Sequence, residues 1–164
     1  MNPLSPETAG LHFAYSDWAS RRLVETAATL SEEELTRDHK SADKSVLGTL
    51  VHVFAADRVW YARVTGTPVT RFVGESDHQL SVLQNDWPAL HQQWLAYLSG
   101  ANLAGVIAYK DMKGNSHQSP LWQIVLHVVN HGTHHRGMVA AMMRSMGHTP
   151  PVLDEIAYFR QLAK

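Results

Sequence analysis

The chain has 164 residues, of which 45% are hydrophobic, and a formal net charge of −1. This length suits one domain with a substantial core, so we expect a single domain over residues 1–164. The balanced charge argues against a nucleic-acid partner and against an anionic membrane surface. No apolar run is long enough to span a bilayer. The N-terminal segment lacks the features of a secretory signal, so we expect a cytoplasmic protein.

The chain contains no cysteine. Disulfides, thiolate metal ligands and a cysteine nucleophile are therefore excluded. It does contain 11 histidines. Histidine is the commonest metal ligand and the usual acid–base residue near neutral pH, so the arrangement of these histidines decides what the sequence can say about function.

The spacing of apolar residues predicts a chain that is helical almost throughout. Ser31 and Glu34 form a capping-box pattern, which predicts a short helical turn. Gly66 suits the position after a helix, and Pro88 should kink or break the helix that contains it. In chain order, the predicted helices cover about residues 6–30, 45–65, 77–99, 120–146 and 154–162.

The segments between the predicted helices are polar or rich in turn residues. Residues 38–44 and 67–75 are predicted to be connectors. Residues 104–119 interrupt the helical pattern, and the turn signal Lys113-Gly114-Asn115 predicts a short hairpin there. Four main helices with moderate connectors predict an all-α, antiparallel four-helix bundle, with this hairpin between the third and fourth long helices.

The fourth long helix carries the clearest histidine pattern. At about 100° per residue, an apolar stripe is centred on His131 and His135. Residues four apart share a helix face, so two imidazoles at this spacing can reach one metal ion. No glutamate follows His131, so the zinc-protease motif is absent. The stripe consists of Ile124, Val128, His131, His135, Met138, Met142 and Met146.

A third ligand has to come from another helix, and His52 is the best candidate. It lies on an apolar side of the second long helix, although on its own it fits a hydrogen-bonded core histidine better than a ligand. The pair His131 and His135 also has a structural alternative, namely two hydrogen-bonded core histidines that face a carboxylate. Spacing alone leaves both interpretations open.

The other polar residues receive simpler interpretations. His127 is expected to be a non-ligand at the edge of the stripe, and His12 a surface residue. Arg136 projects towards solvent and suits a structural ion pair or an interface contact. Glycine costs a helix interior about 1 kcal/mol relative to alanine. The presence of Gly132 and Gly137 in the fourth long helix therefore suggests two sites where another helix approaches closely. The remaining histidines, expected to be solvated, are His39, His78, His91, His117 and His148.

Three segments resemble the DinB superfamily, which includes YfiT-like proteins. Residues 127–137 (HVVNHGTHHRG) resemble its signature helix, 50–60 (LVHVFAADRVW) its second helix and 15–21 (YSDWASR) its first. The resemblance implies a homodimer of four-helix bundles with a three-histidine metal site. The implied ligands are His52, His131 and His135. The family often has glutamine after HRG, where this chain has Met138.

Three histidines leave a coordination position open, as in catalytic zinc sites. We expect one divalent ion per chain, zinc first, with nickel, iron or manganese as alternatives. The family includes thiol transferases, so we favour a metal-dependent transferase that joins a low-molecular-weight thiol to a small electrophile. A hydrolase that uses metal-bound water is one alternative. A non-catalytic metal-binding protein or sensor is another. No general base is evident.

Overall fold

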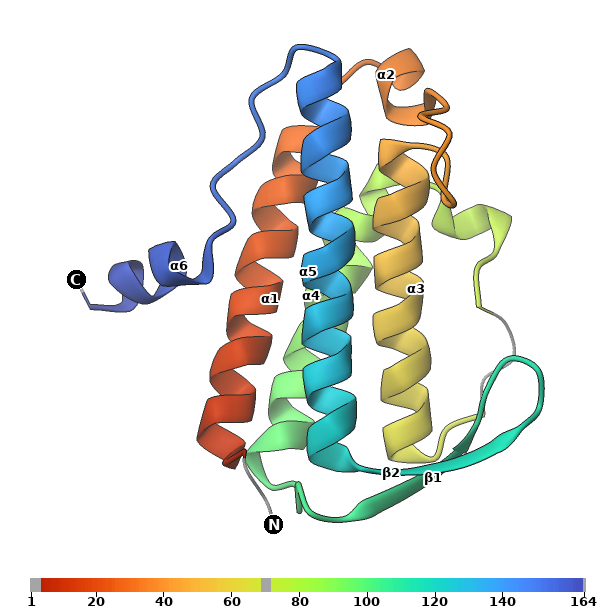
Figure 1. Ribbon diagram of the computed structural model, residues 1–164, viewed down its shortest axis with the longest axis vertical. Coiled ribbons are helices and arrows are strands. Elements are labelled where there is room, and N and C mark those ends of the chain that lie inside the picture. The colour runs from red at the N-terminus through yellow and green to blue at the C-terminus, as the bar shows by residue number, and fades with distance from the viewer. Residues whose placement is uncertain (1–3, 69–71, 164) are drawn as a thin grey trace.

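Four long helices lie side by side and form the body of the molecule (Figure 1). Helices α1 and α5 run in one direction, whereas α3 and α4 run in the other. The predicted bundle is confirmed. Because α3 and α4 run in the same direction, the end of α3 and the start of α4 lie at opposite ends of the bundle. The computed structural model describes residues 4–68 and 72–163, so part of the connection from α3 to α4 lies outside the described residues. The four helices are α1 (Pro6–Ala27), α3 (Val46–Thr65), α4 (Leu80–Ser99) and α5 (Leu121–Ser145).

Short elements fill the connections between these helices. Ser31 and Glu34 cap α2 reciprocally, which confirms the capping box. Gly66 ends α3 with a φ of 72°, the left-handed conformation that glycine adopts without strain. The predicted hairpin is confirmed as an antiparallel pair. The short elements are α2 (Glu32–Thr36), the 3₁₀ turn η1 (Glu75–Asp77), β1 (Val106–Lys110), β2 (Ser116–Pro120) and α6 (Glu155–Leu162).

Two predicted helix limits differ from the structure. Helix α1 ends at Ala27 and not near residue 30. Helix α4 begins at Leu80 and not near residue 77, because Asp77 belongs to a 3₁₀ turn and accepts two hydrogen bonds from Arg58. Pro88 is accommodated within a continuous α4, so of the two predicted outcomes, a kink or a break, the break does not occur.

The buried face of α5 is displaced from the predicted stripe. It includes Val125, Gly132, Val139 and Met143, and is centred near Gly132. At about 100° per residue, His135 and His131 lie roughly 60° and 100° from Gly132, at the edge of this face. The prediction was wrong because it excluded Gly132 and the buried Arg136 from the core. The histidines consequently lie beside the core, where solvent can reach them.

The hairpin is attached to α3 through an aromatic and cationic stack. The rings of Trp60 and Tyr109 are 4.9 Å apart, edge to face. The guanidinium of Arg63 covers both rings, at 4.6 Å from Trp60 and 5.3 Å from Tyr109. This stack fixes the hairpin beside the half of α3 that follows His52.

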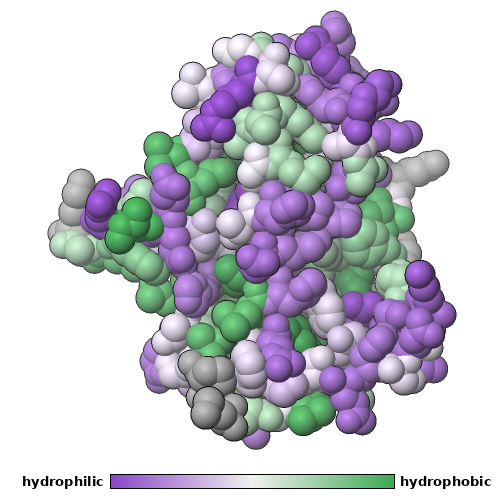
Figure 2. Space-filling view, in the orientation of Figure 1, coloured by the Kyte–Doolittle hydropathy of each residue, from purple (hydrophilic) through white to green (hydrophobic). Residues whose placement is uncertain are grey.

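The C-terminal segment forms an arm that extends from the bundle with α6 near its tip (Figure 1). The Tyr15 hydroxyl donates to the Leu153 carbonyl at 2.9 Å, and His12 Nδ1 lies 2.6 Å from Glu155. No residue of α6 is buried. Apolar side chains are consequently exposed on the arm (Figure 2), including Ile156 at 55%. In the described part of the chain, no helix is long and apolar enough to cross a membrane.

Candidate metal centre

Three histidines from two helices converge beside the core. His52 lies on α3, and His131 and His135 lie one turn apart on α5. The Nε2 atoms of His52 and His131 are 3.1 Å apart. The ring of His135 is centred 4.5 Å from each of the other two rings. Each residue offers a ligand atom, and these atoms all lie within 4.8 Å of one another. Among the described residues, these three could hold a metal ion.

The electrostatic environment favours neutral imidazoles on α5. Burial, and then the neighbouring His135 and His52, lower the pKa of His131 to about 4. Burial and His52 also lower the pKa of His135. Both rings therefore favour the uncharged form, which is the state in which imidazole binds a metal.

Two ring nitrogens in this group have no hydrogen-bond partner within the described chain. They are Nδ1 of His131 and Nδ1 of His135, and both are buried. Buried polar atoms are normally hydrogen-bonded, so each of these two nitrogens lacks a partner that the described residues do not supply. A cluster of neutral nitrogen donors fits a zinc, nickel or iron ion chemically.

Sequence reasoning missed Asp43, which precedes α3. Its Oδ1 lies 3.3 Å from Nδ1 of His52, and its Oδ2 lies 3.7 Å from Nδ1 of His135. The segment was predicted as a polar loop, and nothing in its composition indicates that this carboxylate turns towards two histidines. The only local signal is its position shortly before the helix that carries His52.

Aromatic groups surround the histidines. The edge of the Phe72 ring faces His52, with ring centres 5.4 Å apart. The ring centre of His127 lies 5.8 Å from that of His131 and 5.2 Å from that of Trp60. His127 is outside the group of three. Burial and then Arg63 lower its pKa, so it too favours the neutral form.

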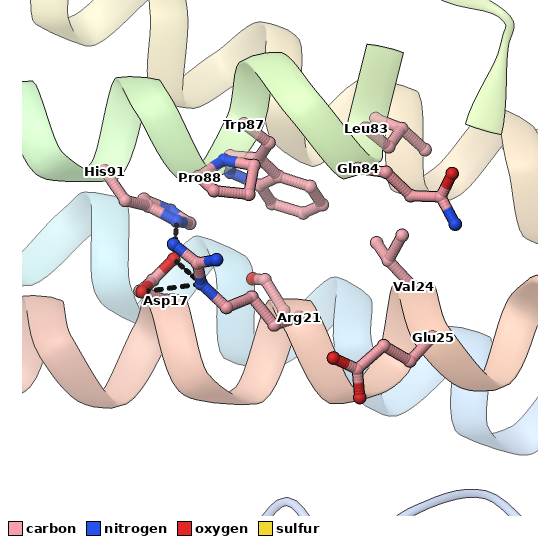
Figure 3. A pocket seen from close by; sticks show the side chains of 10 residues that line it. Asp17, Arg21, Val24, Glu25, Leu83, Gln84, Trp87, Pro88 and His91 are labelled. Atoms are coloured by element: carbon pink, nitrogen blue, oxygen red, sulfur yellow. Dashed lines mark hydrogen bonds and ion pairs between the residues drawn. The ribbon is translucent and has the colours of Figure 1, made fainter. Parts of the chain in front are cut away.

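A second polar cluster, made of residues other than the three histidines, is buried between the helices. His91 is only 1% exposed, so its predicted solvation was wrong. Its Nε2 is 3.1 Å from Asp57. Its Nδ1 is 2.9 Å from Asp17, which also accepts from Arg21 (Figure 3). Asp57 additionally accepts from Trp87. Burial alone lowers the pKa of His91, but the bonds to Asp17 and Asp57 raise it overall.

The members of this cluster on α1 and α4 line a pocket of about 190 Å³ between these two helices. The His91 ring is held between two carboxylates, one at each ring nitrogen. The cluster thus joins three helices, because Asp17 lies on α1, Asp57 on α3 and His91 on α4.

Arg136 also differs from its prediction. It is 2% exposed and points into the bundle, not into solvent. Its Nη1 donates to the hydroxyls of Ser16 and Ser20, at 2.9 and 3.1 Å, and its Nη2 donates to Thr133. The predicted ion pair is replaced by these hydroxyl contacts.

The fold and the three clustered histidines together define the class of the protein. It is a helical bundle with a candidate metal site between two facing helices. The model of the DinB family matches residues 5–162 of the chain. The chain is also 20% identical over 151 residues to Protein DinB of Bacillus subtilis (strain 168), covering 87% of this chain and 88% of the relative. This protein belongs to the DinB family.

Proposed function

We propose that the protein binds one divalent metal ion through His52, His131 and His135. The observation that supports this most directly is the 3.1 Å approach of the His52 and His131 Nε2 atoms, with the His135 ring beside them. Two ring nitrogens at this distance share either a hydrogen-bonding proton or a metal cation, and a cation accounts for the approach of the third ring as well. Zinc is the first candidate, and nickel, iron and manganese are alternatives.

Metal analysis of protein purified without a metal-affinity tag tests this proposal. We expect one ion per chain, lost in both His52→Ala and His131→Ala. His127→Ala is the matched control, because His127 lies one turn before His131 on the same helix but outside the group of three. Retention of a full equivalent of metal in His52→Ala would contradict the proposed ligand set.

We further propose that the centre makes the protein a transferase of low-molecular-weight thiols to small electrophiles. A bound divalent ion supplies Lewis-acid chemistry, which stabilises a thiolate or polarises an electrophile. The chain supplies two neutral imidazoles on α5 and a partly aromatic surround of Phe72 and Trp60. Because the chain has no cysteine, the thiol has to come from the cosubstrate.

The activity is tested by incubating metal-loaded protein with a low-molecular-weight thiol and an electrophilic dye. We expect conjugate formation that is lost in His135→Ala and retained in His127→Ala. Cleavage of an ester or amide without thiol would instead support a metal-dependent hydrolase. Neither reaction with any of several metals would favour a non-catalytic metal-binding protein.

We propose that each chain is a single domain and that the protein is cytoplasmic. We also propose that two copies of the chain associate, as the family resemblance implies. The arm offers the contact surface, since Val152, Ile156 and Leu162 are 55%, 55% and 58% exposed. Light scattering should give twice the 18.3 kDa mass of the chain. Ile156→Asp should shift the mass towards that of one chain, because a charge at an apolar interface loses hydration.

A further inference from the structure

Asp43 faces the outer nitrogens of two of the three histidines. His52 directs Nε2 towards His131, so its Nδ1 is left for Asp43, at 3.3 Å. The other carboxylate oxygen lies 3.7 Å from Nδ1 of His135. Closing this second gap by about 0.8 Å would bring it to hydrogen-bond distance. One carboxylate thus spans a ligand from α3 and a ligand from α5.

The loop that carries Asp43 has a defined conformation. Lys40 and Lys44 both adopt positive φ, 59° and 63°, which non-glycine residues rarely do. The His39 amide donates to the Lys44 carbonyl at 2.7 Å. The loop therefore closes on itself immediately before α3, and Asp43 lies within this closed segment.

Gly48 allows the loop to approach the first turn of α3. A side chain at this position would clash with the carbonyl oxygen of Asp43. Gly48 also precedes His52 by one helical turn, so the Asp43 backbone lies against the turn of α3 before that histidine. Two independent features, the loop closure and the missing side chain, hold the carboxylate beside the site.

We propose that Asp43 is a positioning residue of the metal centre, an inference that rests on the proposed metal site. With the metal bound, its carboxylate would accept hydrogen bonds from Nδ1–H of His52 and, once the 3.7 Å gap closes, of His135. These bonds fix the tautomer in which Nε2 carries a lone pair, and they fix the orientation of each ring. Partners of this kind commonly change metal affinity by about 10–100-fold when they are removed.

The test measures the dissociation constant for Zn²⁺ by competition with a chelator. We expect Asp43→Asn to weaken binding about 10–100-fold. Asp38→Asn is the matched control, because it removes the same charge from the same loop while keeping an oxygen for the Lys40 amide. Its affinity should equal that of the wild type.

A spectroscopic readout separates positioning from a general effect on folding. In the Zn²⁺-loaded wild type, ¹⁵N resonances should show protonated Nδ1 in His52 and His135. In Asp43→Asn the ring ¹⁵N shifts of these two residues should move, and those of His127 should not. A second variant, Gly48→Ala, keeps all three histidines and the carboxylate but displaces the loop, and it too should weaken Zn²⁺ binding.

The outcomes distinguish this inference from the metal site itself. Failure of the wild type to bind Zn²⁺ would remove the proposed function. Wild-type binding with an Asp43→Asn affinity within twofold of it would overturn only the role of Asp43. A deprotonated Nδ1 in His52 of the loaded protein would overturn it as well.

Discussion

A Cβ atom on Gly132 would lie 2.8 Å from Nη1 of Arg136, so the guanidinium occupies the space that a side chain would fill. Nη1 is held there by the hydroxyls of Ser16 and Ser20. Gly132 is therefore a place of close approach, as the sequence suggested, but the approaching group is an arginine side chain from the same helix.

The substitution Gly132→Ala should destabilise the protein by about 1–3 kcal/mol. Alanine favours the helix by about 1 kcal/mol, but displacing Arg136 stretches its bonds to α1 and strains a packed core. Equilibrium unfolding in urea measures the difference in free energy.

Gly137→Ala on the same helix is the control for this substitution. A Cβ there would meet nothing within 4 Å, so only the gain in helix propensity remains. It should stabilise the monomeric fold by up to about 1 kcal/mol. Equal effects of the two substitutions would contradict the packing role assigned to Gly132.

Metal binding should stabilise the fold, because the proposed ligands join α3 to α5. At a free Zn²⁺ concentration 100 times the dissociation constant, the free energy of unfolding should rise by about 2.7 kcal/mol, which corresponds to about 5–10 °C in Tm. Thermal unfolding followed by circular dichroism, with Zn²⁺ and with a chelator, measures the shift. His52→Ala should abolish the shift and His127→Ala should retain it. The same shift in both variants would place the binding elsewhere.

The sequence predicted features that depend on local spacing. The separation of His131 and His135, the helix end at Gly66 and the hairpin turn all arise within a few residues, and the structure has each of them. The burial of His91 and Arg136 was not predictable in this way. Their partners Asp57 and Ser16 are supplied by other helices, and single-helix projection places polar residues in solvent. Asp43 was missed because its direction depends on the conformation of the loop.

The buried cluster around His91 should make stability depend on pH. The pKa of His91 is raised in the fold, so the charged ring stabilises the native state. This contribution is fully present below the unfolded pKa of about 6.5 and is lost as pH rises through the folded value. Asp17 and Asp57 face the ring from α1 and α3, and Arg21 binds Asp17. We expect the wild-type advantage over His91→Gln to shrink with rising pH.

The size of this effect is set by burial. Removing one partner of a buried ionic group costs about 3–5 kcal/mol, because the remaining charges are left uncompensated. Urea unfolding at a series of pH values above 6 measures the difference between the two proteins. His78→Gln, at an exposed histidine, is the control and should show no such trend. A difference that is independent of pH would mean that the His91 proton does not contribute.

The hairpin should depend on its stack against α3. A two-stranded hairpin alone is at best marginally stable in water, and here Tyr109 contacts both Trp60 and Arg63. Tyr109→Ala should therefore accelerate amide exchange throughout β1 and β2 and leave exchange in α5 unchanged.

The control is Met112→Ala, because Met112 is 59% exposed near the turn. Amide exchange in this variant should match that of the wild type. Hydrogen–deuterium exchange read by mass spectrometry resolves these segments. Wild-type protection of both strands in Tyr109→Ala would contradict this prediction. It would mean that backbone hydrogen bonds, such as the one from Leu121 N–H to the Gly105 carbonyl, are sufficient to hold the hairpin.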